Sequence, residues 1–180
     1  LLKEQKNLNI KFMLSIKRYI ILISVTLLLN ISSSAYSAGN SVKSDGRDDF
    51  SYLKAKNSNL KKGLDALKQA KKYVKKNKSN KAKKRFNDAV NFFTLANDEF
   101  PNEPNILNYL GYSFKRTGDF IMAEIYYEQG LTINPQHIDI NNNLGNLYFE
   151  TNRIKKAKGR LKILENCMCE AYQELKNLIK

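Results

Sequence analysis

The sequence predicts an all-α fold, a short right-handed stack of about two and a half to three antiparallel helical hairpins that ends in a C-terminal capping helix. Three observations predict it. The 180 residues include no Trp, three Pro and eight Gly, a composition that disfavours a loop-rich β fold. Apolar residues recur at helical spacing, and the same residue types return after 34 positions.

The repeat is visible as pairs of similar residues that stand 34 positions apart. Leu110, Gly111, Phe114, Ala123 and Tyr127 are matched by Leu144, Gly145, Tyr148, Ala157 and Leu161. The same offset backwards from Ala123, Tyr127, Gly130 and Pro135 gives Ala89, Phe93, Ala96 and Pro101. Two full hairpins and a preceding half are therefore in register.

Glycine inside a helix needs a physical reason, because it costs about 1 kcal/mol relative to alanine. We expect Gly111 and Gly145 to allow a second helix to pack closely, opposite the small side chains of Ala123 and Ala157. Between the helices, residues 117–119 supply a helix-ending Gly followed by an N-capping Asp. The turn signals therefore agree with the period.

The hairpins follow a predicted leader and linker. The predicted segments are an upstream extension plus signal peptide at 1–37, a flexible linker at 38–58, a degenerate Lys-rich first hairpin at 59–103, a repeat at 104–137, a weaker repeat at 138–166 and a capping helix at 167–180. About 14 extra residues lie in the first hairpin, which we expect to form helices near 59–76 and 81–99.

From Met13 the chain has the pattern of a secretory signal peptide. A basic pair is followed by an apolar run at 19–31 and by small residues, and we expect cleavage after Ser37. The run is shorter than the roughly 20 residues that a spanning helix needs. The prediction is a periplasmic or secreted protein, with an uncleaved inner-membrane anchor as the alternative.

Residues 101–136 read PNEPNILNYLGYSFKRTGDFIMAEIYYEQGLTINPQ, and this segment resembles a tetratricopeptide repeat (TPR). Residues 138–165 resemble a weaker copy, in which Asn141 replaces a large apolar residue and Asn152-Arg153 replaces Gly-Asp at the turn. With its leader, basic first hairpin and C-terminal Cys pair, the chain is similar to small exported TPR proteins of alphaproteobacteria. The resemblance implies a protein-binding scaffold.

In proteins of this family, ligand peptides lie across the first helix of each hairpin, which gives candidate partner-binding residues. They are Asn108, Tyr112, Lys115, Asn142 and Asn146. Asn offers both a donor and an acceptor to a peptide backbone, and Lys115 offers a cation to a carboxylate. Ordinary surface residues are the alternative interpretation. The predicted partner is an unidentified protein or peptide.

The segment Lys54–Arg85 holds fourteen Lys or Arg residues and one acid, Asp65, in a chain whose net charge is +14. Candidate anion-binding residues are Lys71, Lys72, Lys75, Lys76, Lys83, Lys84 and Arg85. The alternative function is electrostatic binding to an anionic membrane surface or polyanion. A solvated, lysine-rich helix face competes with it. Nucleic acid is disfavoured, because Tyr73 is the only aromatic residue in the segment.

No catalytic, cofactor or metal motif stands out, so we predict that the chain is not an enzyme. His137 has no metal ligands at suitable spacing and is expected in a solvated turn. Cys167 and Cys169 suit a disulfide in an oxidising compartment, but only where the chain is non-helical. Free buried thiols and a metal or redox role stay open. In the resembling proteins the two Cys stand further apart, which leaves their presumed bridge open here.

Overall fold

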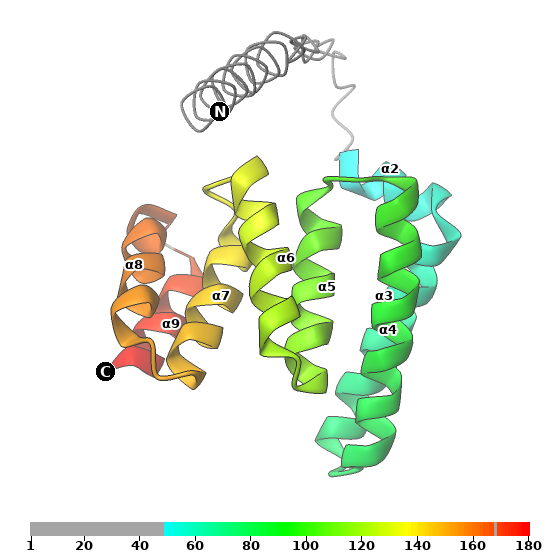
Figure 1. Cartoon of the computed structure of the whole chain (residues 1–180), viewed down its shortest axis with the longest axis horizontal. Coiled ribbons are helices and arrows are strands. Elements are labelled where there is room, and N and C mark those ends of the chain that lie inside the picture. Colours follow the sequence, from blue (N-terminus) through cyan, green and yellow to red (C-terminus); the bar gives the residue numbers. More distant parts are fainter. Residues whose placement is uncertain (1–48, 168) are drawn as a thin grey trace, which may run out of the picture. The chain divides into compact units, whose positions relative to one another are not determined.

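The computed structural model describes residues 49–167 and 169–180, and the regular elements of that part are helices (Figure 1). They are α2 (Asp49–Lys56), α3 (Ser58–Lys75), α4 (Ser79–Glu99), α5 (Pro104–Thr117), α6 (Phe120–Ile133), α7 (Ile138–Glu150), α8 (Ile154–Leu164), a 3-10 turn (Glu165–Cys167) and α9 (Glu170–Ile179). The predicted leader and residues 38–48 of the predicted linker lie outside the described residues. The all-α prediction is confirmed.

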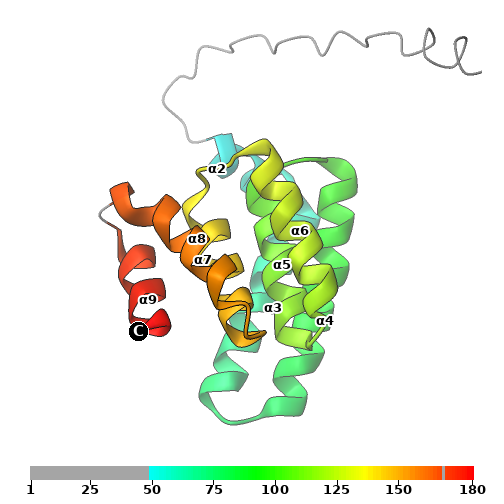
Figure 2. The same ribbon diagram turned by 60° about the vertical axis from the view of Figure 1, so that its left-hand side comes forward.

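Three helical hairpins follow one another along the chain. In each, the two helices pack against each other: α3 with α4, α5 with α6, and α7 with α8. Contacts between α4 and α5 and between α6 and α7 join successive hairpins, and α9 packs on α7 and α8 (Figure 2). Both hydrophobic clusters belong to the compact unit Gly46–Lys180, so this unit has the core that a domain needs to fold by itself.

Aromatic rings of the second helices cover the glycines of the first helices. A Cβ atom built on Gly111 would lie 2.5 Å from Cε1 of Tyr127, and one on Gly63 would lie 2.5 Å from Cε1 of Phe93. The side chain nearest to Gly111 is therefore that of Tyr127 and not that of Ala123. The bare backbone makes room for a large ring and not for a small side chain, so each glycine adds an aromatic contact to the core.

In the third hairpin, a side chain of the capping helix α9 covers the glycine of the first helix. The atoms nearest to a Cβ on Gly145 would be Cδ2 and Cδ1 of Leu175, at 2.5 and 3.0 Å, and Cβ of Arg160, at 3.3 Å. The side chains nearest to Gly145 are therefore those of Leu175 and Arg160 and not that of Ala157. Leu161, which stands at the position of the aromatic residue in the repeat, is half-buried, and Leu175 of α9 covers the glycine instead.

The turns explain two departures from the repeat pattern. Gly118 ends α5 with φ 97°, and Asp119 caps α6 by accepting a hydrogen bond from the backbone N of Met122 at 3.0 Å. In the next hairpin Asn152 supplies the left-handed residue, with φ 58°, which Asn tolerates better than most side chains. Arg153 gives no side-chain cap to α8 but donates two hydrogen bonds to Glu124 of α6, at 2.8 and 2.6 Å.

Asn141, which the sequence showed as a missing apolar residue, is fully buried. Its Nδ2 donates to the backbone oxygens of Pro135 and His137 at 2.9 and 3.0 Å, and its Oδ1 accepts from Arg160 at 3.3 Å. His137 is half-buried and caps α7, with Nδ1 accepting from the backbone N of Ile140 at 3.4 Å. The solvated turn predicted for His137 is therefore wrong.

The first hairpin is the longest. In the first hairpin, the residue that caps the end of α3, Lys76, stands 13 positions after Gly63. In the second hairpin, the residue that caps the end of α5, Gly118, stands only 7 positions after Gly111. The lengthened hairpin projects beyond its neighbours in Figures 1 and 2. Before it, residues 49–56 form α2, so the linker prediction is wrong there. Phe50 and Leu53 pack against the first hydrophobic cluster, which orders this polar segment.

Candidate functional site

The first helices of the second and third hairpins and the capping helix form one continuous face. Helix α5 contacts α7 and α7 contacts α9, whereas the second helices α6 and α8 do not make comparable contact with each other. Helices that touch between hairpins lie on the inner side of a curved stack. We call the surface of α5, α7 and α9 the inner face, and all five predicted partner-binding residues belong to its helices.

Polar side chains join α5 to α7 across the inner face. Nδ2 of Asn143 donates to Oδ1 of Asn108 at 2.9 Å, and Asn108 is 5% exposed. Nζ of Lys115 lies 2.8 Å from Oε1 of Glu150, and the Lys115 side chain is only 12% exposed. Lys115 is thus already paired, and a ligand carboxylate would have to displace Glu150 to bind it. The accessible charge here is the Glu150 carboxylate, whose side chain is 45% exposed.

A second group of polar contacts joins α7 to α9. Nδ2 of Asn142 donates to Oε2 of Glu174 at 2.9 Å. Nδ2 of Asn146 donates to the backbone oxygen of Asn142 at 2.9 Å and to its Oδ1 at 3.0 Å. Among the described residues, no hydrogen bond reaches Oδ1 of Asn146, so this acceptor is open to a ligand.

Tyr112 on α5 belongs to the inner face, whereas Tyr127 on α6 is buried against Gly111. The half-buried Tyr112 packs edge-on against Phe86, with ring centroids 6.1 Å apart, and Nζ of Lys71 lies 5.3 Å from its ring centre. The buried Tyr127 has a hydroxyl with no hydrogen-bond partner in the described chain. Burial raises the pKa of Tyr127 well above its usual value, and Tyr112 and the charge of Glu150 raise it further. Tyr127 therefore stays neutral.

The start of the inner face also carries acidic charge. Burial raises the pKa of Tyr109, and the negative charge of Asp139 on α7 adds to the effect. Burial lowers the pKa of His137, although the charges of Asp139 and Glu103 oppose it. Nε2 of His137 lies 3.3 Å from Oδ1 of Asn105 on α5. Burial outweighs these charges, so the histidine that links α5 and α7 is favoured in its neutral form.

Sequence reasoning missed Asn143, Glu150 and Glu174 on this face. The repeat period contained a signal for the first two, because Asn143 stands 35 residues after Asn108 and Glu150 stands 35 after Lys115. Residues one position beyond the period face the previous hairpin in both cases. Glu174 has no such signal, since α9 lies outside the repeat.

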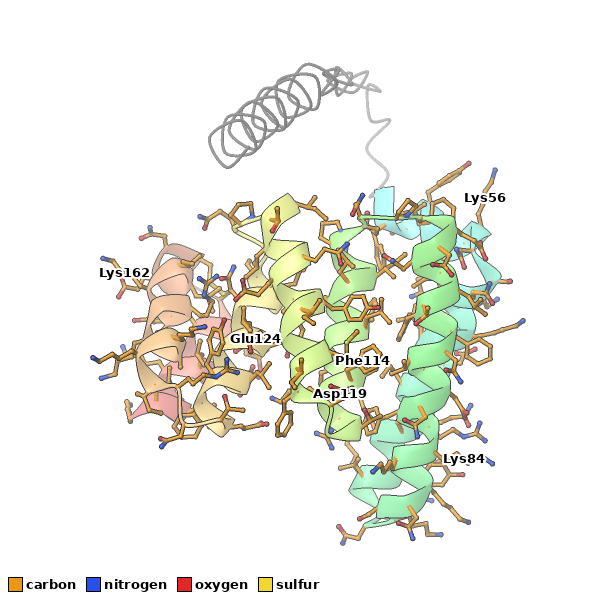
Figure 3. All side chains as sticks on the ribbon, viewed as in Figure 1. Lys56, Lys84, Phe114, Asp119, Glu124 and Lys162 are labelled. Atoms are coloured by element: carbon orange, nitrogen blue, oxygen red, sulfur yellow. A yellow bond between two sulfur atoms is a disulfide. The ribbon has the colours of Figure 1, made fainter. Side chains whose placement is uncertain are left out.

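The predicted anion-binding residues are placed together on the projecting end of the first hairpin. Lys71, Lys72, Lys75, Lys76, Lys83 and Lys84 are exposed, and Arg85 is half-buried and pairs with Asp88 at 3.1 Å. Figure 3 shows Lys84 near this end of α4, away from Glu124 on α6 and Lys162 on α8. Lys71 connects this Lys cluster to the inner face, because its Nζ lies 5.3 Å from the ring centre of Tyr112. The other predicted anion-binding residues belong to the first hairpin and not to α5, α7 or α9.

Cys167 and Cys169 are joined by a disulfide, with their Cα atoms 5.1 Å apart. Cys167 ends the 3-10 turn after α8, and Cys169 precedes α9 in an extended conformation, so neither lies within an α-helix. Within the described residues, no group of three or more His, Cys, Asp or Glu side chains is arranged to hold a metal ion. In the same part of the chain, no helix has the length and apolar character needed to cross a membrane.

Comparisons with known proteins agree with this architecture. A family model described as "Tetratricopeptide repeat" matches residues 105–137. An uncharacterized protein, ycf37 of Pyropia yezoensis, is 39% identical over 54 residues, which make up 30% of this chain and 30% of that protein. The match thus spans less than a third of the curated relative's length.

Solved TPR domains have a similar fold. The TPR domain of Arabidopsis OM64 has a TM-score of 0.51 and 16% identity and covers 67% of this chain and 96% of its own. The first TPR domain of human RPAP3 has a TM-score of 0.50 and 20% identity, covering 65% of this chain and 89% of its own.

Proposed function

We propose that the inner face binds an extended segment of a partner protein. The basis is that this chain is a tetratricopeptide repeat protein, and hence a scaffold for protein–protein interaction. One observation supports this proposal above the others. Half-buried amide side chains gather on helices that touch, and Oδ1 of Asn146 accepts no hydrogen bond among the described residues. Asn146 lies beside Asn142, to whose Oδ1 it donates at 3.0 Å.

The spacing of the inner face suits an extended chain. Neighbouring helices pack with axes roughly 8–10 Å apart, and an extended chain advances about 3.3 Å per residue. A bound segment therefore crosses one helix with about every third residue, so side chains of α5, α7 and α9 contact successive parts of it. Asn amides bond the backbone groups of such a segment whatever its sequence.

Charge on the inner face indicates what the partner carries. Glu150 pairs with the nearly buried Lys115, but its carboxylate stays accessible from outside. Glu174 on α9 is also exposed. A basic side chain in the bound segment can pair with either carboxylate. We therefore propose a segment with one or more Lys or Arg residues.

The test is selection from a display library of short random peptides with the purified chain from Ala38 to Lys180. We expect enriched peptides to contain basic residues and to lose binding by tenfold or more, about 1.4 kcal/mol, when Asn142 and Asn146 are both changed to Ala. The control changes Asn87 and Asn91, an exposed pair with the same spacing on α4. Equal binding by both double variants, or no enrichment, would rule out the inner face as the site.

We also propose that the protein acts after export. The leader pattern before Ser37 supports this compartment, and so does the disulfide between Cys167 and Cys169, since such bonds persist in oxidising environments. Mass spectrometry of the protein from fractionated cells tests it. Export predicts a periplasmic or secreted chain that starts at Ala38 and has no free thiol. A cytoplasmic chain with two free thiols contradicts it.

A further inference from the structure

The projecting end of the first hairpin concentrates positive charge. We call residues 71–85 the arm; they include nine Lys or Arg residues and no Asp or Glu. The second helix of this hairpin is lengthened as well as the first. The distance along the sequence from the N-cap of the second helix to the equivalent repeat alanine is 11 residues here, from Lys78 to Ala89. It is 4 residues in the next hairpin, from Asp119 to Ala123. Each helix of the hairpin thus gains about two turns.

This charge is local and is largely left unpaired. Residues 86–180 contain ten basic and twelve acidic residues, so the lysine-rich composition is not spread evenly over the fold. Within the described residues, the one salt bridge that involves the arm joins Arg85 to Asp88. A coding bias toward lysine alone would not leave the remaining hairpins slightly acidic. Like charges packed on one arm also repel each other, which is a cost without a ligand.

The arm has dimensions that suit a flat charged surface. Two turns of helix are roughly 10 Å long, close to the Debye length of about 8–10 Å at physiological salt. If the arm meets a surface end-on, all of its cations lie within about one Debye length of that surface. A nucleic-acid duplex that lay along the arm would contact only the cations on one side of it.

The apex of the arm carries an apolar side chain among the cations. Val74 continues the buried stripe of α3 formed by Ala66, Leu67 and Ala70, but it is 39% exposed because α4 does not begin until Ser79. An apolar side chain surrounded by cations fits the boundary between lipid headgroups and acyl chains. It adds nothing to binding a phosphate backbone, and the half-buried Tyr73 is the only aromatic residue available there for base stacking.

We propose that the arm docks this protein end-on onto a membrane surface rich in anionic phospholipid, with Val74 entering the headgroup region. Each basic residue near such a surface contributes roughly a fivefold change in partitioning. The docking uses residues of the first hairpin and none of α5, α7 or α9, which leaves the inner face free to hold a partner at the membrane.

The first experiment measures co-sedimentation of the chain from Ala38 to Lys180 with two kinds of vesicle. One is an equimolar mixture of phosphatidylglycerol and phosphatidylcholine, and the other is phosphatidylcholine alone. We expect binding to the first only, weakened steeply by added salt. Changing Lys72, Lys76, Lys81 and Lys84 together to Gln should lower the partition coefficient by at least about 100-fold, since four fivefold effects combine.

The matched control removes the same charge from the other large Lys cluster. Lys158, Lys162, Lys176 and Lys180 line one shallow pocket between α8 and α9, and these four become Gln in the control. We expect this control to retain binding within about fivefold, the effect of one charge. Equal losses in the two variants would show an effect of net charge and overturn the proposal. Binding to duplex DNA but not to the anionic vesicles would overturn it in favour of a nucleic acid.

A second measurement reports on the apex itself. The chain has no Trp, so Val74→Trp introduces a single fluorescent reporter at the tip, and Ile121→Trp places one on the exposed surface of α6. We expect a blue shift with the phosphatidylglycerol vesicles for Val74→Trp and none for Ile121→Trp. Equal shifts at both sites, or no shift at position 74 in a variant that sediments with the vesicles, would refute end-on docking.

Discussion

Gly111 and Gly159 provide the sharpest test of how the hairpins pack, because the same change to Ala should have opposite effects at the two positions. Both glycines lie within helices, so each substitution gains about 1 kcal/mol of helix propensity. Only the surroundings differ. A Cβ at Gly111 would meet three ring atoms of the buried Tyr127 at 2.5, 2.6 and 2.9 Å, whereas nothing lies within 4 Å at the exposed Gly159.

The magnitudes follow from these distances. Carbon atoms pack best at about 3.5–4.0 Å, so Gly111→Ala forces α5 and the ring of Tyr127 apart by about 1 Å. Overpacking of this kind costs about 3 kcal/mol at the upper end of its usual range, which leaves a net loss of about 2 kcal/mol after the gain in propensity. Gly159→Ala retains its gain of about 1 kcal/mol. The two variants should differ by about 3 kcal/mol.

Thermal and urea unfolding followed by circular dichroism measure the difference. A domain of this size shifts its Tm by about 4 °C per kcal/mol, so Gly111→Ala should melt about 8 °C below the wild type and Gly159→Ala about 4 °C above it. Gly111→Ala with Tyr127→Leu is the compensating control, since a smaller side chain leaves room for the new methyl group. If Gly111→Ala alone is as stable as Gly159→Ala, the close packing of Tyr127 on α5 is refuted.

Three further predictions concern polar groups and the disulfide. Partial burial acts to raise the pKa of Glu124, but the hydrogen bond and charge of Arg153 outweigh it and the pKa is lowered from 4.5. The ionised carboxylate therefore stabilises the fold above the pKa of the unfolded chain, and this stability is lost as the pH falls through the lower pKa of the folded protein. In urea unfolding between about pH 5 and pH 3, the free energy of unfolding should fall less for Glu124→Gln than for the wild type. Asn141→Ala removes the donor to the backbone oxygen of Pro135 and the acceptor for Arg160, and should cost about 1–3 kcal/mol in the same assay. Changing Cys167 and Cys169 to Ser should cost less than about 2 kcal/mol, since the bridge closes a very short loop, and a loss of folding would contradict this.

The sequence was informative wherever the 34-residue period applies. It predicted the hairpins, the left-handed Gly118 and the packing role of Gly111, because these features depend on residues within one hairpin. It did not predict which side chain covers the glycine. The expectation that small residues lie opposite each other takes no account of the angle at which the two helices cross. It also predicted a linker where α2 lies, because the contact between Phe50 and the ring of Tyr109 comes from another hairpin.

The candidate site was predicted less completely than the fold. The period places Asn108, Lys115 and Asn142 on first helices, and the structure has all three on the inner face. The 35-residue offset indicates the partners of Asn108 and Lys115, but it is informative only once the spacing of α5 and α7 is known. Glu174, the partner of Asn142, could not be predicted, because it belongs to a helix without a counterpart in the repeat.

Compensation explains why the third hairpin departs from the pattern and still continues the stack. In the first two hairpins an aromatic ring of the second helix fills the space over a glycine, but the third hairpin has the smaller Leu161 at that position. The space over Gly145 is taken by Leu175, which is fully buried. Helix α9 is therefore part of the repeat core and not a separable cover. Because Glu174, the residue beside Leu175, holds Asn142, the contact that completes the core also fixes the end of the inner face.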